Sequence, residues 1–327
     1  MSHWKTICGA ATLSVLGLTG AMAQDWPTRP VTMVVAFAPG GPIDTLARNL
    51  QPYLIETLGQ NVIIENVPGG GGTTGSLRVS NAAADSHMFT LGSIGTHAIG
   101  QSMHKGKPPY DATADFSPVI LVADAPQVLL VRKDLPASNL KEFAAYAKAN
   151  HEKMQHGSGG SGTSSHIGCV LLNQVIGVKV THIPYRGGGP AMQDLLAGRI
   201  DYICNYISTA IASHEAKTAK VIAALTSKRT ASFPDVPTAE EVGFKGLDVS
   251  AWNAVFMPKN TPPATVAKLN AAISKALDNP ALKTRLEKIG LEVPEPARRT
   301  PEYLKQYVAS EINRWEAPVK ASGVAFD

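Results

Sequence analysis

Apolar runs of strand length alternate with longer helical patterns along most of the chain. The runs Val31–Phe37, Val62–Glu65 and Val180–Pro184 are each followed by a glycine-containing turn and then by apolar residues at helical spacing. Short strands that alternate with helices of this kind favour α/β architecture with largely parallel sheets. The hydrophobic pattern therefore predicts an α/β fold.

The same pattern assigns most of the chain to elements. Strands are expected at 31–37, 62–65, 88–93, 119–124, 128–132, 154–157, 180–184, 200–205, 221–225 and 249–257. Helices are expected at 44–58, 73–84, 139–149, 165–176 and 190–197, with three more beginning near Thr261, Pro280 and Pro301. Asn139 and Glu142 resemble a capping box, and Gly177 is a typical residue after a helix end.

The chain returns to a strand at Val249 after a block of α/β units and is helical from there on. This return predicts two lobes. Lobe one is expected to comprise residues 25–124 and 249–327, and lobe two residues 125–248.

The first 23 residues have the features of a secretory signal peptide. Lys5 is the positive n-region, Ile7–Leu18 is a mostly apolar segment, and Ala21-Met22-Ala23 is a small-x-small cleavage site. The apolar segment is shorter than the ~20 residues that span a bilayer. We therefore expect a chain that is exported to the periplasm and is not embedded in the membrane.

Composition excludes some classes of function. The formal net charge of +4 over 327 residues is mild and spread along the chain, which gives no nucleic-acid footprint. Outside the signal peptide, Cys169 and Cys204 either form one disulfide or remain as two buried thiols, and their spacing matches no metal site. No cofactor is expected, and the chain is expected to be a monomer.

The stretch Phe37–Arg48 is the first candidate for binding chemistry. A buried strand leads into the turn Pro39-Gly40-Gly41-Pro42 and then into a helix expected to begin at Asp44. A glycine turn before a helix start aims backbone N–H groups and a positive helix end at one place, which suits a carboxylate or a phosphate. An ordinary βα turn is the simpler alternative.

A second candidate is the loop Gly157–His166, with Ser158, Ser161, Thr163 and Ser164 as hydroxyl donors before a helix. The alternative is a flexible loop. This loop and Gly70–Gly75 both match G-x-G-x-x-G, but neither has the acidic residue ~20 positions on that a dinucleotide site requires.

Catalytic and metal chemistry find little support. The chain has no G-x-S-x-G elbow, and His97, His156, His166 and His182 are not spaced as zinc ligands. Arg186 either holds a carboxylate or lies on the surface. Trp252 is a core residue or part of a cleft wall.

Four segments together resemble one family. WPTRPVTMVVAFAPGGPIDTLAR, LGQNVIIENVPGGGGTTG, HGSGGSGTSSHIGCVLL and IPYRGGGPAMQDLLAGRIDY occur in the order seen in the Bug family, the periplasmic solute-binding receptors of tripartite tricarboxylate transporters. The similarity runs from about Trp26 to the C-terminus. Two segments depart from the family pattern: Pro42-Ile43, where small residues are usual, and the turn at residues 84–87.

The resemblance implies a two-lobe, Venus-flytrap binding protein of type II-like topology. It also implies a carboxylate between the lobes, held by backbone amides, hydroxyls and bridging waters. The residues placed at the ligand by position are Phe37, Pro39, Gly40, Gly41, Asp44, Ser93, Thr96, His97, Ser158, Gly159, Ser161, Thr163, Ser164, His166, Tyr185, Arg186, Gly188, Asn205 and Trp252.

The expected function is therefore binding without catalysis, with delivery of the carboxylate to transporter membrane subunits. A sensor for a two-component kinase and an enzyme on the same two-lobe plan are the alternatives. Flat walls from Phe37, His97, Tyr185 and Trp252 would favour an aromatic mono- or dicarboxylate such as terephthalate. Four-carbon dicarboxylates, citrate-like acids and acidic amino acids are the other ligand classes.

Overall fold

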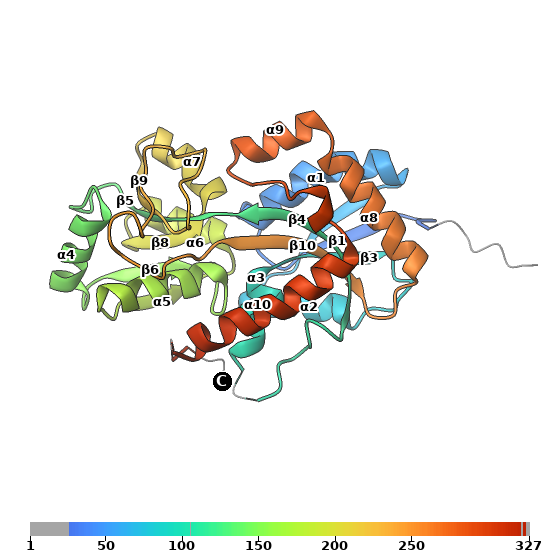
Figure 1. Ribbon diagram of the computed structural model, residues 1–327, viewed down its shortest axis with the longest axis horizontal. Helices are drawn as coiled ribbons and strands as arrows, with labels where there is room; N and C mark the ends of the chain where they lie inside the picture. The colour runs from blue at the N-terminus through green and yellow to red at the C-terminus, as the bar shows by residue number, and fades with distance from the viewer. Residues whose placement is uncertain (1–25, 105, 322, 325–327) are drawn as a thin grey trace, which may run out of the picture.

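The computed structural model describes residues 26–104, 106–321 and 323–324. The proposed signal peptide lies outside the described residues. Two five-stranded sheets lie side by side along the long axis of the molecule, each covered by helices, and two long strands pass between them (Figure 1). The expected two-lobe α/β fold is confirmed.

The first sheet has the strand order β2-β1-β3-β10-β4. Strands β1, β2 and β3 are parallel, and β10 is antiparallel to both β3 and β4, so the sheet is mixed rather than largely parallel. Its strands are β1 (Val31–Val35), β2 (Val62–Asn66), β3 (Met88–Ser93), β4 (Phe116–Ala125) and β10 (Ala251–Pro258).

The second sheet has the order β7-β6-β8-β5-β9. Strands β7, β6 and β8 are parallel neighbours, whereas β5 is antiparallel to β8 and β9. Its strands are β5 (Gln127–Arg132), β6 (Gln155–Ser158), β7 (Thr181–Pro184), β8 (Tyr202–Tyr206) and β9 (Ala219–Ala224). Each sheet thus contains three parallel strands whose carboxyl ends lie at one edge.

Helices follow most of the parallel strands. The helices of the described chain are α1 (Pro42–Leu58), α2 (Thr73–Ser80), α3 (Ile94–His97), α4 (Leu140–Asn150), α5 (Ser164–Ile176), α6 (Gly188–Leu196), α7 (Ile207–Glu215), α8 (Pro263–Leu277), α9 (Pro280–Lys288) and α10 (Pro301–Ala321). Three 3₁₀ turns are η1 (Gly70–Gly72), η2 (Ile99–Ser102) and η3 (Pro296–Arg298).

Local sequence signals explain several boundaries. Asn139 caps α4 by accepting a hydrogen bond from Glu142 N at 3.0 Å, and Gly177 ends α5 in the left-handed conformation, both as expected. Two start signals are corrected. Helix α1 is capped by Gly41, with Pro42 as its first residue, and Thr261 bonds back to Pro258 O instead of capping α8.

The chain passes between the sheets twice, from β4 to β5 and from β9 to β10. All residues of β10 are buried, and this strand pairs with β3 and β4 in the first sheet. Helix α10 packs against β4 and η2. We propose residues up to 124 and from 249 onward as lobe one, and residues 125–248 as lobe two.

A disulfide joins Cys169 of α5 to Cys204 of β8, which resolves the alternative left open by the sequence. Both cysteines are fully buried. The bond ties the helix after β6 to the neighbouring parallel strand, close to Asn205, and closes a loop across a sequence separation of 35 residues.

Removing this bond should destabilise the protein. In the chain-entropy model a loop of this length contributes about 3–4 kcal/mol to the free energy of unfolding. We expect the double variant Cys169→Ala/Cys204→Ala to lose that amount in urea unfolding followed by circular dichroism. The matched control is reductant, which should lower the stability of the wild type and leave the double variant unchanged. Equal stability of both oxidised proteins would contradict the expectation.

Candidate functional site

A small cavity lies between the two lobes. Lobe one contributes Phe37, Pro42, Ile43 and Ser93, and lobe two contributes Gly159, Thr163, Ser164, Ser165, Gly188, Asn205 and Tyr206. None of these described lining residues is charged. The cavity has a volume of about 30 Å³, and one water needs about 10–15 Å³, so the two lobes lie close together at this point.

Three helix N-termini of lobe two converge on this cavity. Thr163 is the N-cap of α5, Gly188 is the first residue of α6, and Tyr206 is the N-cap of α7. The three helices follow β6, β7 and β8, whose carboxyl ends share one edge because the strands are parallel neighbours. Each helix start carries unsatisfied N–H groups and a partial positive charge, so this wall favours an anion.

Hydrogen bonds hold the loop before α5 in place. Thr163 Oγ1 donates to Gly160 O at 2.7 Å, and Gly159 N donates to Ser165 Oγ at 3.0 Å. Ser164 Oγ donates to Tyr206 Oη at 3.3 Å, and burial raises the pKa of Tyr206 to about 12. The loop is therefore an ordered set of neutral hydroxyl and amide groups, and not the flexible loop of the alternative.

The turn before α1 contributes less than the sequence led us to expect. Gly40 N donates to Asp44 Oδ2 at 2.9 Å, and Asp44 also accepts from Arg48 and Asn66. Burial opposes ionisation of Asp44, but these hydrogen bonds outweigh it and lower its pKa. The carboxylate at this helix start is therefore that of Asp44 itself, and the ligand contacts expected of Gly40 and Asp44 stay predictions.

Three of the four rings expected to form flat walls lie elsewhere. His97 is buried and stacks on Phe256 with ring centroids 3.9 Å apart, and burial lowers its pKa to about 3. Trp252 is 1 % exposed and donates its indole N–H to Glu311. Tyr185 donates to Asp194 at 2.7 Å. Each ring is committed to lobe packing, and only Phe37 lines the cavity.

The cavity thus includes part of the predicted set. The predicted residues that line it are Phe37, Ser93, Gly159, Thr163, Ser164, Gly188 and Asn205. The predicted residues that do not line it are Pro39, Gly40, Gly41, Asp44, Thr96, His97, Ser158, Ser161, His166, Tyr185, Arg186 and Trp252. Arg186 is exposed, and its carbonyl oxygen accepts from Ala38 N at 2.9 Å across the lobes.

Four lining residues were not named individually among the expected ligand contacts: Pro42, Ile43, Ser165 and Tyr206. Pro42 and Ile43 lie in the first candidate stretch, Phe37–Arg48, and Ser165 lies in the second candidate loop, Gly157–His166. Tyr206 follows the predicted strand at 200–205 directly, but it precedes α7, a helix that the analysis did not predict.

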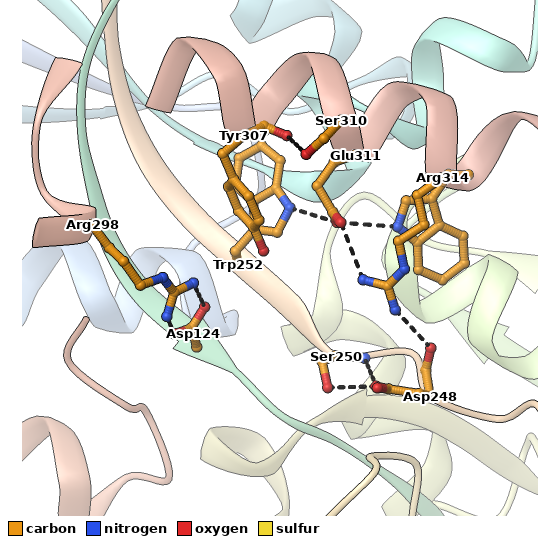
Figure 2. A network of polar contacts seen from close by, with 10 residues as sticks. Asp124, Asp248, Ser250, Trp252, Arg298, Tyr307, Ser310, Glu311 and Arg314 are labelled. Atoms are coloured by element: carbon orange, nitrogen blue, oxygen red, sulfur yellow. Dashed lines mark hydrogen bonds and ion pairs between the residues drawn. The ribbon is translucent and has the colours of Figure 1, made fainter. Parts of the chain in front are cut away.

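The strands that cross between the lobes are anchored by α10 and η3 (Figure 2). Arg298 forms two hydrogen bonds, of 2.6 and 3.0 Å, to Asp124 at the end of β4. Burial opposes the charge of Arg298, but these bonds outweigh it and raise its pKa. Figure 2 shows that Glu311 accepts from Trp252 on β10 and pairs with Arg314, which reaches Asp248 O. Both crossings are therefore tied to one C-terminal segment.

Three stacked histidines lie behind the loop that precedes α5. The rings of His166 and His182 are 3.8 Å apart, and those of His156 and His182 are 4.9 Å apart. His166 Nδ1 accepts from Gly162 N at 3.2 Å, and His182 Nε2 lies 2.7 Å from Ser158 Oγ. No group of His, Cys, Asp or Glu side chains in the described part of the chain is arranged to hold a metal ion.

Among the helices at residues 26–104, 106–321 and 323–324, none has both the length and the apolar character to cross a bilayer.

Comparison with known proteins identifies a receptor family. The family model described as "Tripartite tricarboxylate transporter family receptor" matches residues 46–324. MatC of Rhodopseudomonas palustris, solved with bound malate, is 42 % identical with a TM-score of 0.87, over 90 % of this chain and 100 % of that one. The periplasmic binding protein BugD is 36 % identical with a TM-score of 0.88, over 92 % and 99 %. Another R. palustris protein, solved with adipate, is 32 % identical with a TM-score of 0.87, over 92 % and 99 %.

The histidine stack predicts acid sensitivity. Burial, with repulsion between the rings, lowers the pKa of His156 and His166 to about 3, and burial lowers that of His182 to about 4. The unfolded chain binds these protons near pH 6.5 and the folded chain does not, so stability is full above pH 6.5 and falls as the pH drops towards 4. Urea unfolding at pH 8 and pH 5 should show this loss.

The variant His182→Gln should show a smaller loss between pH 8 and pH 5, because one linked proton is removed. The amide of glutamine can still bond Ser158. The stability difference at pH 8 serves as the control, since it reports packing alone. A loss identical to that of the wild type would show that His182 is not linked to unfolding.

Proposed function

This chain belongs to the tripartite tricarboxylate transporter receptor family, and we propose that it captures a small carboxylate in the periplasm and delivers it to a transporter of that kind. The observation that carries the proposal is the convergence of three helix N-termini on an uncharged cavity between two lobes. Transport takes precedence over sensing because the matching family model describes transporter receptors.

The chemistry of the cavity suits a carboxylate. Its donors are neutral hydroxyls, amides and helix starts, each helix start contributing about 0.3–1 kcal/mol to the binding of an anion and more when partly buried. Asn205 is among the described lining residues that can donate to carboxylate oxygens, and the hydroxyl of Ser164 can do so when it turns away from Tyr206. Such a set stabilises a singly charged group without the lysine or arginine that phosphate usually recruits.

The two lobes play different parts. Lobe two supplies the polar wall, while Phe37, Pro42 and Ile43 of lobe one supply an apolar wall on the other side of the cavity. A ligand carboxylate would rest on lobe two, and closure of lobe one would cover its carbon chain. Closure is favoured by such a ligand because contacts with both lobes exist only in the closed form.

We place aliphatic dicarboxylates first among the ligands. The expectation of an aromatic acid depended on four rings forming flat walls, and of these four only Phe37 lines the cavity. Tyr206, which was not among the four, lines it as well. Relatives in this family were solved with malate and with adipate, which are both aliphatic dicarboxylates.

A thermal-shift panel tests the ligand class. Succinate, malate, adipate, benzoate and terephthalate are compared, with sulfate as a control anion. A ligand at 100 times its Kd should add about 2.7 kcal/mol to the free energy of unfolding. We expect aliphatic diacids to raise the midpoint and sulfate to leave it unchanged. A shift with terephthalate alone would restore the aromatic class, and no shift with any acid would contradict the proposed function.

Asn205→Asp tests the location of the carboxylate. The substitution keeps the oxygen that accepts from Tyr206 N and adds a negative charge at the polar wall. Two like charges about 4 Å apart cost about 4 kcal/mol at an effective dielectric constant of 20, so affinity should fall by about a hundredfold or more in calorimetry.

The matched control for this variant is Asn173→Asp. Asn173 is also nearly buried in lobe two, and its side-chain oxygen also accepts a hydrogen bond, from Tyr202, but it does not line the cavity. This control should bind the same acid within a fewfold of the wild type. Equal losses in both variants would place the carboxylate elsewhere.

A further inference from the structure

The glycine-rich segments lie mainly where the two lobes touch each other. We define the glycine seam as Gly40, Gly41, Gly71 and Gly95 of lobe one together with Gly160, Gly162 and 187–189 of lobe two. Of these, only Gly188 lines the cavity. The seam therefore includes glycines from both segments that match G-x-G-x-x-G. Most glycines of these two segments do not line the cavity.

The first part of the seam joins the turn before α1 to the turn before α6. Ala38 N donates to Arg186 O at 2.9 Å, a backbone hydrogen bond between the lobes. A Cβ atom added at Gly189 would lie 3.1 Å from the carbonyl carbon of Gly40 and 3.2 Å from Pro39 O. These neighbours are backbone atoms of the opposite lobe, so they cannot rotate away as a side chain could.

The other two parts have the same character. A Cβ at Gly160 would lie 3.2 Å from Gly71 Cα, and a Cβ at Gly95 would lie 3.2 Å from Thr163 Cα. In both places a main chain of lobe one lies against a main chain of lobe two. Along the seam, the two lobes thus touch through backbone atoms and not through side chains.

The seam determines how far the lobes can close. Backbone atoms in van der Waals contact resist compression, because protein interiors are close-packed and have low compressibility. The closed form leaves only about 30 Å³ in the cavity, so every added methylene of a ligand must be accommodated by parting the seam. Long ligands therefore lose more seam contacts than short ones.

We propose that Gly95 and Gly189 are specificity-determining residues, which set the length of dicarboxylate that the site accepts by fixing the closed separation of the lobes. This inference rests on the proposed function. Neither residue lines the cavity, so their influence on the ligand acts through lobe separation and not through contact.

Alanine substitutions at Gly95 and Gly189 should affect the closure of the lobes without affecting folding. Gly95 lies in α3 and Gly189 in α6, and neither has a positive φ, so the local conformation accepts alanine. Alanine in a helix is at least as favourable as glycine. The strain from the new methyl group arises only against the other lobe, and only when the lobes are closed.

The experiment measures the Kd of succinate and of adipate by calorimetry for the wild type, Gly95→Ala, Gly189→Ala and the control Gly106→Ala. Gly106 is exposed, and a Cβ there meets nothing within 4 Å. We expect the ratio of the adipate Kd to the succinate Kd to fall about fivefold or more in both seam variants. A change of this size is within reach, because one methylene is worth ~10-fold or more in a fitted pocket and the two diacids differ by two methylenes. The control should keep the wild-type ratio.

An unchanged ratio in the seam variants would overturn the inference. This holds even if both Kd values rose together, because the substitutions would then weaken closure equally for the short and the long diacid. If the wild type binds neither diacid, the proposed function fails. The seam is then judged by small-angle X-ray scattering of the free proteins. A larger radius of gyration for both seam variants than for Gly106→Ala supports a limit on closure, and an unchanged radius overturns it.

Discussion

The structure depends on the alignment of three helix starts at the carboxyl edge of β7, β6 and β8. The beginnings of α5, α6 and α7 meet at one cavity because parallel neighbouring strands end at the same edge. The disulfide between α5 and β8 holds the central helix to that edge. In the function we propose, lobe two is therefore a preorganised surface for an anion that has no charged side chain among the described lining residues.

Lobe one has a related layout, with β2, β1 and β3 parallel, but a different electrostatic outcome. At its first helix start the chain provides its own carboxylate, Asp44, which is held by Gly40 and Arg48. Proline at position 42 also removes one backbone donor from the helix start. The remaining surface toward the cavity is apolar, apart from Ser93. The site is thus polar on one lobe and apolar on the other.

Movement between the lobes must pass through two strands that are both held by the C-terminal segment. Asp124 is fixed by Arg298, and the start of β10 is fixed by Glu311 and Arg314 of α10 (Figure 2). In this structure backbone lies against backbone along the glycine seam, and the ion pairs lie on the hinge side. The hinge side and the seam lie on different sides of the cavity, and both are held firmly. A small change at the seam should therefore alter the distance between the lobes and with it the size of the cavity.

Most of the architecture could be predicted from the sequence, because it is encoded in local patterns. Alternating strand and helix periods, the cap at Asn139 and the glycine at 177 specify their own elements, and the order of four glycine-rich segments identifies the family. The first signals depend on residues within a few positions of one another, and the segment order is read along the sequence, so no knowledge of spatial contacts is needed.

The cavity itself was decided by tertiary structure. His97, Tyr185 and Trp252 looked suitable for a cleft, but their partners Phe256, Asp194 and Glu311 draw them into lobe packing. Phe256 and Glu311 are remote in sequence from His97 and Trp252. Conversely, Tyr206 and Ile43 reach the cavity because separate lobes are brought together. Which side chain faces a ligand depends on tertiary contacts between segments that are distant in sequence, and a local sequence pattern does not encode those contacts.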